Sequence, residues 1–132
     1  MDAGAWIALN DRGDRYYPAA VSYYQRVLRD RHPLVTTNLV IAEAYIAIRR
    51  AGGHQPAFRF LDSMRQSSRL TKIYSDAILE ADAEALLRRY VDQSFSLADA
   101  VSFVVMRQRS IREAFAFDGH FVTAGFVVVP TT

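Results

Sequence analysis

The 132-residue sequence contains no cysteine. This absence excludes disulfides, zinc sites built on thiolates and catalytic thiols, and it fits a reducing compartment. No apolar run approaches the roughly 18 to 20 residues that cross a membrane. No basic segment followed by an apolar one opens the chain, so a secretory signal is not indicated. We therefore expect a cytoplasmic protein that has no membrane partner.

Lysine is almost absent, because Lys72 is the single lysine among 16 basic residues. The arginine fork suits bidentate contact with phosphate or carboxylate, although a GC-rich genome that favours arginine codons is the simpler explanation. The net charge is only +2, and the basic residues are spread along the chain, which excludes a basic tail. The sequence also lacks a glycine-rich phosphate loop and a recognisable serine or threonine nucleophile motif.

Repeats, low-complexity tracts and long linkers are absent too, so we expect residues 1–132 to form a single domain. Short apolar segments without polar alternation indicate strands buried on both faces, and segments of helical periodicity alternate with them. This order predicts an α/β fold, a three-layer α/β/α sandwich with a mostly parallel sheet. The expected strands span 34–37, 70–74, 114–117 and 127–129, and the expected helices span 19–31, 38–50, 56–67, 76–90 and 97–108, with Asn38 and Ser96 as N-caps.

Four acidic residues lie within or at the edge of apolar runs, where charges must pair or bind metal. They are Asp2, Glu43, Asp99 and Asp118. Open parallel sheets place ligand sites at the carboxyl ends of their strands. Glu43 and Asp118 follow predicted strands, and Asp99 lies in the first turn of a predicted helix. We expect these three at one rim of the sheet, joined by Asp2 if it follows a central strand.

Each of these carboxylates also has a purely structural explanation. Asp99 completes a capping box with Ser96, Asp118-Gly119 is a common turn dipeptide, and Asp2 can cap a helix. Glu43 is harder to explain structurally, because its neighbours at helical spacing are apolar and predict a buried carboxylate. The separate explanations do not account for four carboxylates on one rim.

A divalent cation would account for the set. Ligands that are all oxygen, without cysteine, select a hard cation such as Mg²⁺ or Mn²⁺, which keeps several waters and is completed by substrate phosphates. Such a site suits phosphodiester hydrolysis, in which the metal activates water and neutralises the leaving oxygen. Nucleic acid is the substrate class that this chemistry indicates.

Four segments together resemble the acidic motifs of the PIN-domain ribonucleases, in order and spacing, over nearly the whole chain. The size and the closing Phe-Asp-x-His-Phe pattern are most similar to the VapC-type toxins of bacterial toxin and antitoxin pairs. The segments are Asp2 to Ala5, Thr37 to Glu43, Ser96 to Ala100, and Ala116 to Phe121 with Gly125-Phe126.

The resemblance implies a sheet of about five strands and an endoribonuclease that depends on Mg²⁺ or Mn²⁺. It also implies a homodimer, a cognate antitoxin and RNA as the substrate. Carried over position by position, Asp2 and Asp99 become the most direct metal ligands. Glu43 and Asp118 then ligate through water or position the nucleophile.

The start of the chain departs from the family pattern. PIN domains carry several apolar residues of a central strand before the first acidic residue, whereas only Met1 precedes Asp2. Either the start of the chain is truncated or its start codon is misassigned, or the first strand is genuinely minimal, and a strand reduced to a stub would hold Asp2 poorly. This keeps a second hypothesis open, a catalytically inactive PIN-like module that binds RNA or protein, and a third, a DNA or structure-specific nuclease. His120 suits either RNA contact or a structural role beside Phe121.

Overall fold

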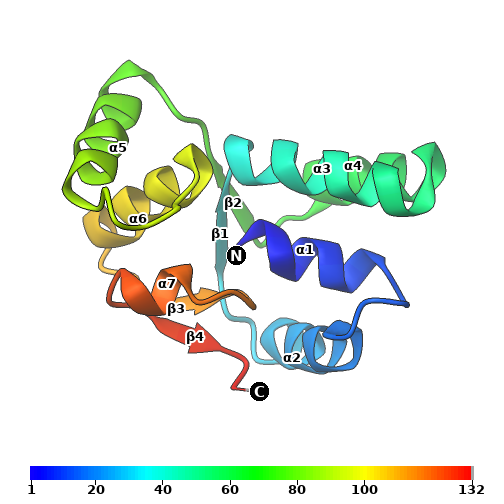
Figure 1. Ribbon diagram of the computed structural model, residues 1–132. Helices are drawn as coiled ribbons and strands as arrows, with labels where there is room; N and C mark the ends of the chain where they lie inside the picture. The colour runs from blue at the N-terminus through cyan, green and yellow to red at the C-terminus, as the bar shows by residue number, and fades with distance from the viewer. Residues whose placement is uncertain (132) are drawn as a thin grey trace.

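The computed structural model describes residues 1–131, in which helices and strands alternate (Figure 1). Every predicted strand and helix is present, with ends that differ from the prediction by at most two residues. A further short helix follows Asp2, and another follows Gly119. The elements are α1 (Ala3–Asn10), α2 (Tyr17–Arg29), β1 (Leu34–Thr37), α3 (Asn38–Gly52), α4 (His54–Gln66), β2 (Leu70–Ile73), α5 (Ala77–Arg89), α6 (Leu97–Gln108), β3 (Glu113–Phe115), α7 (His120–Thr123) and β4 (Val127–Val129).

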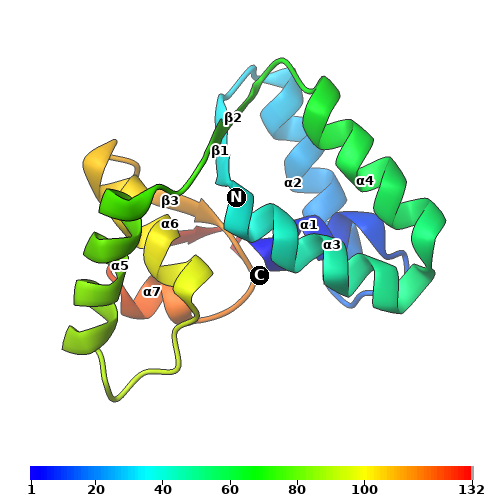
Figure 2. The same ribbon diagram turned by 90° about the horizontal axis from the view of Figure 1, so that it is seen from above.

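The helices cover both faces of the strands, which confirms the α/β/α sandwich (Figure 2). On one face α1, α3 and α4 form a core around Trp6, Val40 and Phe60. On the other face α5 and α6 pack around Leu86 and Phe103. Both faces are therefore apolar, which explains why the strands lack polar alternation. Among the described residues, no helix combines the length and apolar character that a membrane crossing requires.

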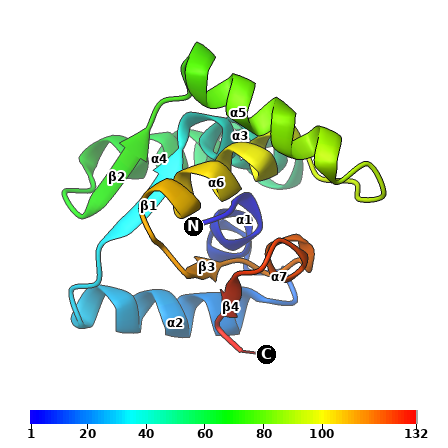
Figure 3. The same ribbon diagram turned by 90° about the vertical axis from the view of Figure 1, so that its left-hand side faces the viewer.

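The described strands form two parallel pairs, β1 with β2 and β3 with β4, where a sheet of about five strands was expected. Met1 and Asp2 lie between the pairs, at the place of the fifth strand (Figure 3). The Met1 ammonium donates to the Val35 carbonyl at 2.7 Å, and the Asp2 N–H donates to the Phe115 carbonyl at 2.9 Å. Two residues thus bridge the inner edges of β1 and β3.

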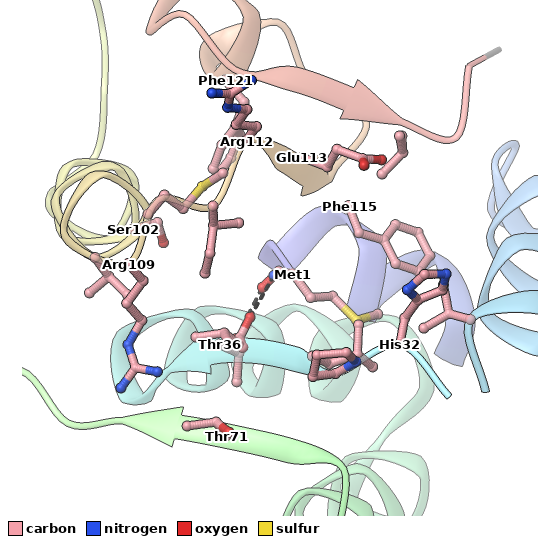
Figure 4. A pocket seen from close by; sticks show the side chains of 18 of the residues that line it. Met1, His32, Thr36, Thr71, Ser102, Arg109, Arg112, Glu113, Phe115 and Phe121 are labelled. Carbon is pink, nitrogen blue, oxygen red and sulfur yellow. Dashed lines mark hydrogen bonds between the residues drawn. The ribbon is translucent and has the colours of Figure 1, made fainter. Parts of the chain in front are cut away.

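A cleft of about 690 Å³ opens beside Met1, on the side away from Asp2, and its lining comes mainly from β1, β3 and the end of α6. Figure 4 shows this cleft, with the hydrogen bond that the Thr36 hydroxyl donates to the Met1 carbonyl at 3.0 Å. The ammonium of Met1 is buried here, and burial lowers its pKa from 8.0 to about 6. Within residues 1–131, no strand lies between the inner edges of β1 and β3 along the cleft.

We expect an engineered extension of three or four Val and Ile residues ahead of Met1 to stabilise the protein. The extension would replace the buried ammonium by an amide, pair with both inner edges and bury apolar side chains worth about 1.5–3 kcal/mol each. The measurement is the melting temperature, and the matched control is a Gly-Ser extension of equal length. Equal melting temperatures for the two extensions would contradict this prediction.

One predicted helix cap is wrong. Asn38 was expected to cap α3, but the Thr37 hydroxyl accepts the N–H of Val40 at 3.2 Å and is the observed N-cap. The Asn38 side chain instead accepts the N–H of Ser75 at 2.8 Å and ties α3 to the loop before α5. Both side chains are good cap acceptors, so the sequence alone could not separate adjacent candidates.

Candidate metal centre

Asp99 is buried at the start of α6, where its exposed fraction is 6%. Its Oδ2 accepts the N–H of Ser96 at 3.1 Å, and the Ser96 hydroxyl accepts the N–H of Asp99 at 3.0 Å. This is the capping box that the sequence predicted. The cap uses Oδ2, and no hydrogen bond within residues 1–131 engages Oδ1. Capping and ion binding are therefore compatible in one carboxylate.

Asp118 follows β3 in an exposed turn, as the Asp-Gly dipeptide predicted. Its Oδ1 accepts the N–H of His120 at 2.9 Å, which fixes the carboxylate against the first turn of α7. Phe121 anchors α7 by packing edge-on against Phe103, with ring centroids 5.0 Å apart. The turn is thus held on a buried aromatic residue while Asp118 stays open to solvent.

Asp2 is buried, with 5% of its surface exposed, although it immediately follows the first residue. Within residues 1–131 its side chain makes no N-cap hydrogen bond to α1, and an interaction with the backbone N–H of Ala3 lowers its pKa. Burial and the charges of Asp118 and Asp99 raise the pKa of Asp2 from 3.8 to about 7. The expectation that a short first strand would hold Asp2 poorly is wrong, because the bond from its N–H to Phe115 fixes its backbone.

Glu43 is exposed, which corrects the expectation that it points into an apolar stripe. The buried stripe of α3 consists of Val40, Ala44 and Ile48, and Ile46 remains 42% exposed. The carboxylate nevertheless belongs to the acidic group. Partial burial and the charges of Asp99 and Asp118 raise the pKa of Glu43, and a hydrogen bond from the Ser96 hydroxyl lowers it.

The four carboxylates thus act on one another electrostatically, as the rim argument expected. The tightest group consists of Asp99, Asp118 and His120, whose potential ligand atoms all lie within 4.8 Å of one another. Within residues 1–131, the contact of His120 Nδ1 with Asp99 Oδ2 at 2.8 Å is the only ion pair. No arginine or lysine of the described chain therefore neutralises these carboxylates, and a bound cation would. The donor set fits a divalent ion that prefers oxygen ligands.

The sequence alone did not indicate His120 as part of the site. Its two-residue distance from Asp118 is a weak signal, and the alternatives given for it were RNA contact or a role beside Phe121. The bond to Asp99 joins residues that are 21 positions apart. Only the packing of α7 beside α6 brings them together.

The fold is shared with one family of proteins. The PIN domain model matches residues 1–127, so the chain belongs to the PIN domain family. It is 35% identical over 130 residues to the 23S rRNA-specific endonuclease VapC20 of Mycobacterium tuberculosis, from strains CDC 1551 and H37Rv, which covers 98% of this chain and 95% of that protein. The crystal structure of M. tuberculosis VapC20, described as a sarcin-ricin loop cleaving toxin, superposes with a TM-score of 0.84. That match has 34% identity and covers 96% of this chain and 94% of that one.

Proposed function

We propose that this protein is an endoribonuclease that depends on a divalent metal ion and serves as the toxin of a toxin and antitoxin pair. The convergence of Asp2, Asp99 and Asp118 without a neutralising arginine or lysine carries this proposal. The likeness to VapC20 over nearly the whole of both chains supports RNA as the substrate. We further propose that residues 1–132 form one PIN-like nuclease domain and that the protein acts in the cytoplasm.

In this proposal Asp2 and Asp99 hold the metal ion most directly. Both are buried, the backbone of Asp2 is tied to β3, and the N–H of Ser96 orders the Asp99 carboxylate before the ion binds. A bound Mg²⁺ or Mn²⁺ would lower the pKa of water and stabilise the charge that develops on the phosphate. Glu43 and Asp118 are exposed, and they face the solvent from which water and substrate arrive. They orient the attacking water or bind the ion through water.

The metal requirement is the first test of this function. Purified protein is incubated with total ribosomal RNA in Mg²⁺, in Mn²⁺ and with a chelator, and transfer RNA and single-stranded DNA are the comparison substrates. We expect discrete cleavage of ribosomal RNA in either metal and none with the chelator. Cleavage that survives the chelator would refute metal dependence, and preferential cleavage of DNA would favour the third hypothesis.

The buried Asp2 favours this function over an inactive binding module. The case for an inactive module depended on a loosely held Asp2, but its backbone is tied to β3 and the Met1 ammonium is tied to β1. A protein that only binds a partner gains nothing from a buried carboxylate whose pKa is raised to about 7. Retained RNA binding together with no cleavage in either metal would reverse this preference.

We also propose a homodimer and a cognate antitoxin as partners. No arginine or lysine of residues 1–131 pairs with these carboxylates, which suggests how an antitoxin inhibits the enzyme. An arginine that enters the acidic site would pair with Asp99 and Asp118 in place of the metal ion. Replacing that arginine in the antitoxin should restore cleavage, and unchanged inhibition would count against this mode of inhibition.

A further inference from the structure

We propose that His120 is a positioning residue that orients Asp99 for metal binding. This inference rests on the proposed metal site and assigns a role to a side chain outside the four carboxylates. His120 touches Asp99 and leaves the ion to the carboxylate, so its effect on catalysis passes through Asp99. The observations are a short hydrogen bond, a fixed ring and a carboxylate with one remaining free oxygen.

A hydrogen bond joins His120 to Asp99. His120 Nδ1 lies 2.8 Å from Asp99 Oδ2, the same oxygen that accepts the N–H of Ser96 at 3.1 Å. An ionised carboxylate only accepts hydrogen bonds, so Nδ1 carries the proton in this pair. Two donors on Oδ2 fix the plane of the carboxylate and turn Oδ1 away from both of them. Oδ1 is then the oxygen that is left for a cation.

The imidazole ring is itself held in place from two sides. The backbone N–H of His120 donates to Asp118 Oδ1 at 2.9 Å. The imidazole ring packs edge-on against the ring of Phe95, with centroids 5.3 Å apart. Phe95 is buried in the loop that leads into α6. The side chain of His120 is only 35% exposed. A ring that served solely to fill space would not need to direct Nδ1 at a buried carboxylate.

This arrangement also joins two acidic residues that are far apart in the sequence. Asp99 begins α6, whereas Asp118 lies in the turn before α7. His120 contacts Asp99 through its ring and Asp118 through its backbone. The distance between these two carboxylates therefore depends on His120. Loss of the ring should loosen Asp99 relative to Asp118. Partners that orient a ligating side chain typically account for about 10- to 100-fold in metal affinity.

Two amide substitutions test this role, because each places an N–H donor near the position of one of the two imidazole nitrogens. The amide nitrogen of Asn lies near the place of Nδ1, whereas that of Gln lies near the place of Nε2. We expect His120→Ala and His120→Gln to weaken Mn²⁺ binding about 10- to 100-fold. His120→Asn should restore most of the affinity. His54→Ala, on α4 and outside the acidic group, is the matched control.

Mn²⁺ affinity is measured on the protein without RNA, by the loss of the free-ion signal in electron paramagnetic resonance. Melting temperatures establish that each variant is folded. Equal affinities of wild type and folded His120→Ala would overturn the positioning role and leave the proposed function intact. Absence of Mn²⁺ binding by wild type would overturn both.

The same sample distinguishes positioning from direct ligation. If Nδ1 stays on Asp99, pulsed electron paramagnetic resonance of bound Mn²⁺ should show no coupling to a directly bound imidazole nitrogen. Such a coupling, lost in His120→Ala, would overturn the proposal and make His120 a ligand. Equal loss of affinity in the Asn and Gln variants would also overturn it, because the Nδ1 position would then carry no special weight.

Discussion

Asp99→Asn should lower the rate of ribosomal RNA cleavage by about 10²- to 10³-fold, the usual cost of removing one electrostatic group from a reacting centre. Asp99 receives two hydrogen bonds on Oδ2. An asparagine meets that demand best by placing its amide oxygen there. Its NH₂ group then occupies the position of Oδ1 and presents partial positive charge to the cation. The variant therefore loses the ion while it keeps the capping bond from Ser96.

The matched control for this variant is Asp92→Asn. Asp92 is exposed and lies outside the acidic group, and within residues 1–131 its side chain accepts one hydrogen bond, from Gln93 at 3.5 Å. Cleavage is measured under single-turnover conditions, and folding is checked by the melting temperature. Undiminished cleavage by folded Asp99→Asn would place the reaction elsewhere on the protein. An equal decrease in both variants would indicate a general charge effect on RNA binding.

The elements of the fold could be predicted because their signals are local. Ser96 caps α6 as expected. The acidic rim was also predictable, because parallel strands bring their carboxyl ends to one edge. The location of Glu43 and Asp118 at this edge follows from their positions after strands and does not depend on the conformation of any loop.

The features that the sequence did not reveal depend on packing between distant segments. His120 reaches Asp99 only because α7 is anchored against α6 through Phe121. Glu43 was expected to be buried because its helical neighbours are apolar. The buried side of α3 is rotated by one residue, toward Val40 and Ala44. An apolar helix with several candidate stripes does not show which stripe faces the core.

The structure at the start of the chain differs from the prediction in how Asp2 is held. A first strand reduced to Met1 was expected to leave Asp2 loose, on the assumption that a strand must be long to be held. Asp2 needs one backbone bond to β3, and Met1 needs one to β1. The cleft beside Met1 lies along the same inner edges of β1 and β3. Asp2 can therefore be held at the site without a full strand between β1 and β3.

The burial of Asp2 should make the metal-free protein less stable as the pH rises from about 4 to about 7. The native pKa of Asp2 is raised from 3.8 to about 7, so within this window the folded protein holds a proton that the unfolded chain has released. The free energy of unfolding then falls by at most about 1.4 kcal/mol per pH unit from this group. The Met1 ammonium, with its pKa lowered to about 6, adds stability with rising pH between about 6 and 8. Between pH 4 and pH 6 the Met1 ammonium contributes little, whereas Glu43, whose pKa is also raised, acts in the same direction as Asp2. The effect of Asp2 itself is therefore obtained by comparison with a variant.

Asp2→Asn is the variant that measures this effect, because it keeps the size of the side chain and removes its charge. The difference in unfolding free energy between Asp2→Asn and wild type, from urea titrations in chelator, should grow in favour of the variant from pH 4 to pH 6. Mg²⁺ should reverse the order at pH 7, since an ion bound only by the folded state stabilises it. Wild type gains that stabilisation, and the variant, which lacks one ligand, gains less. If the difference in unfolding free energy between Asp2→Asn and wild type did not change with pH, Asp2 would be ionised throughout this range. Burial of an uncompensated carboxylate could then not be the reason that this site attracts a cation.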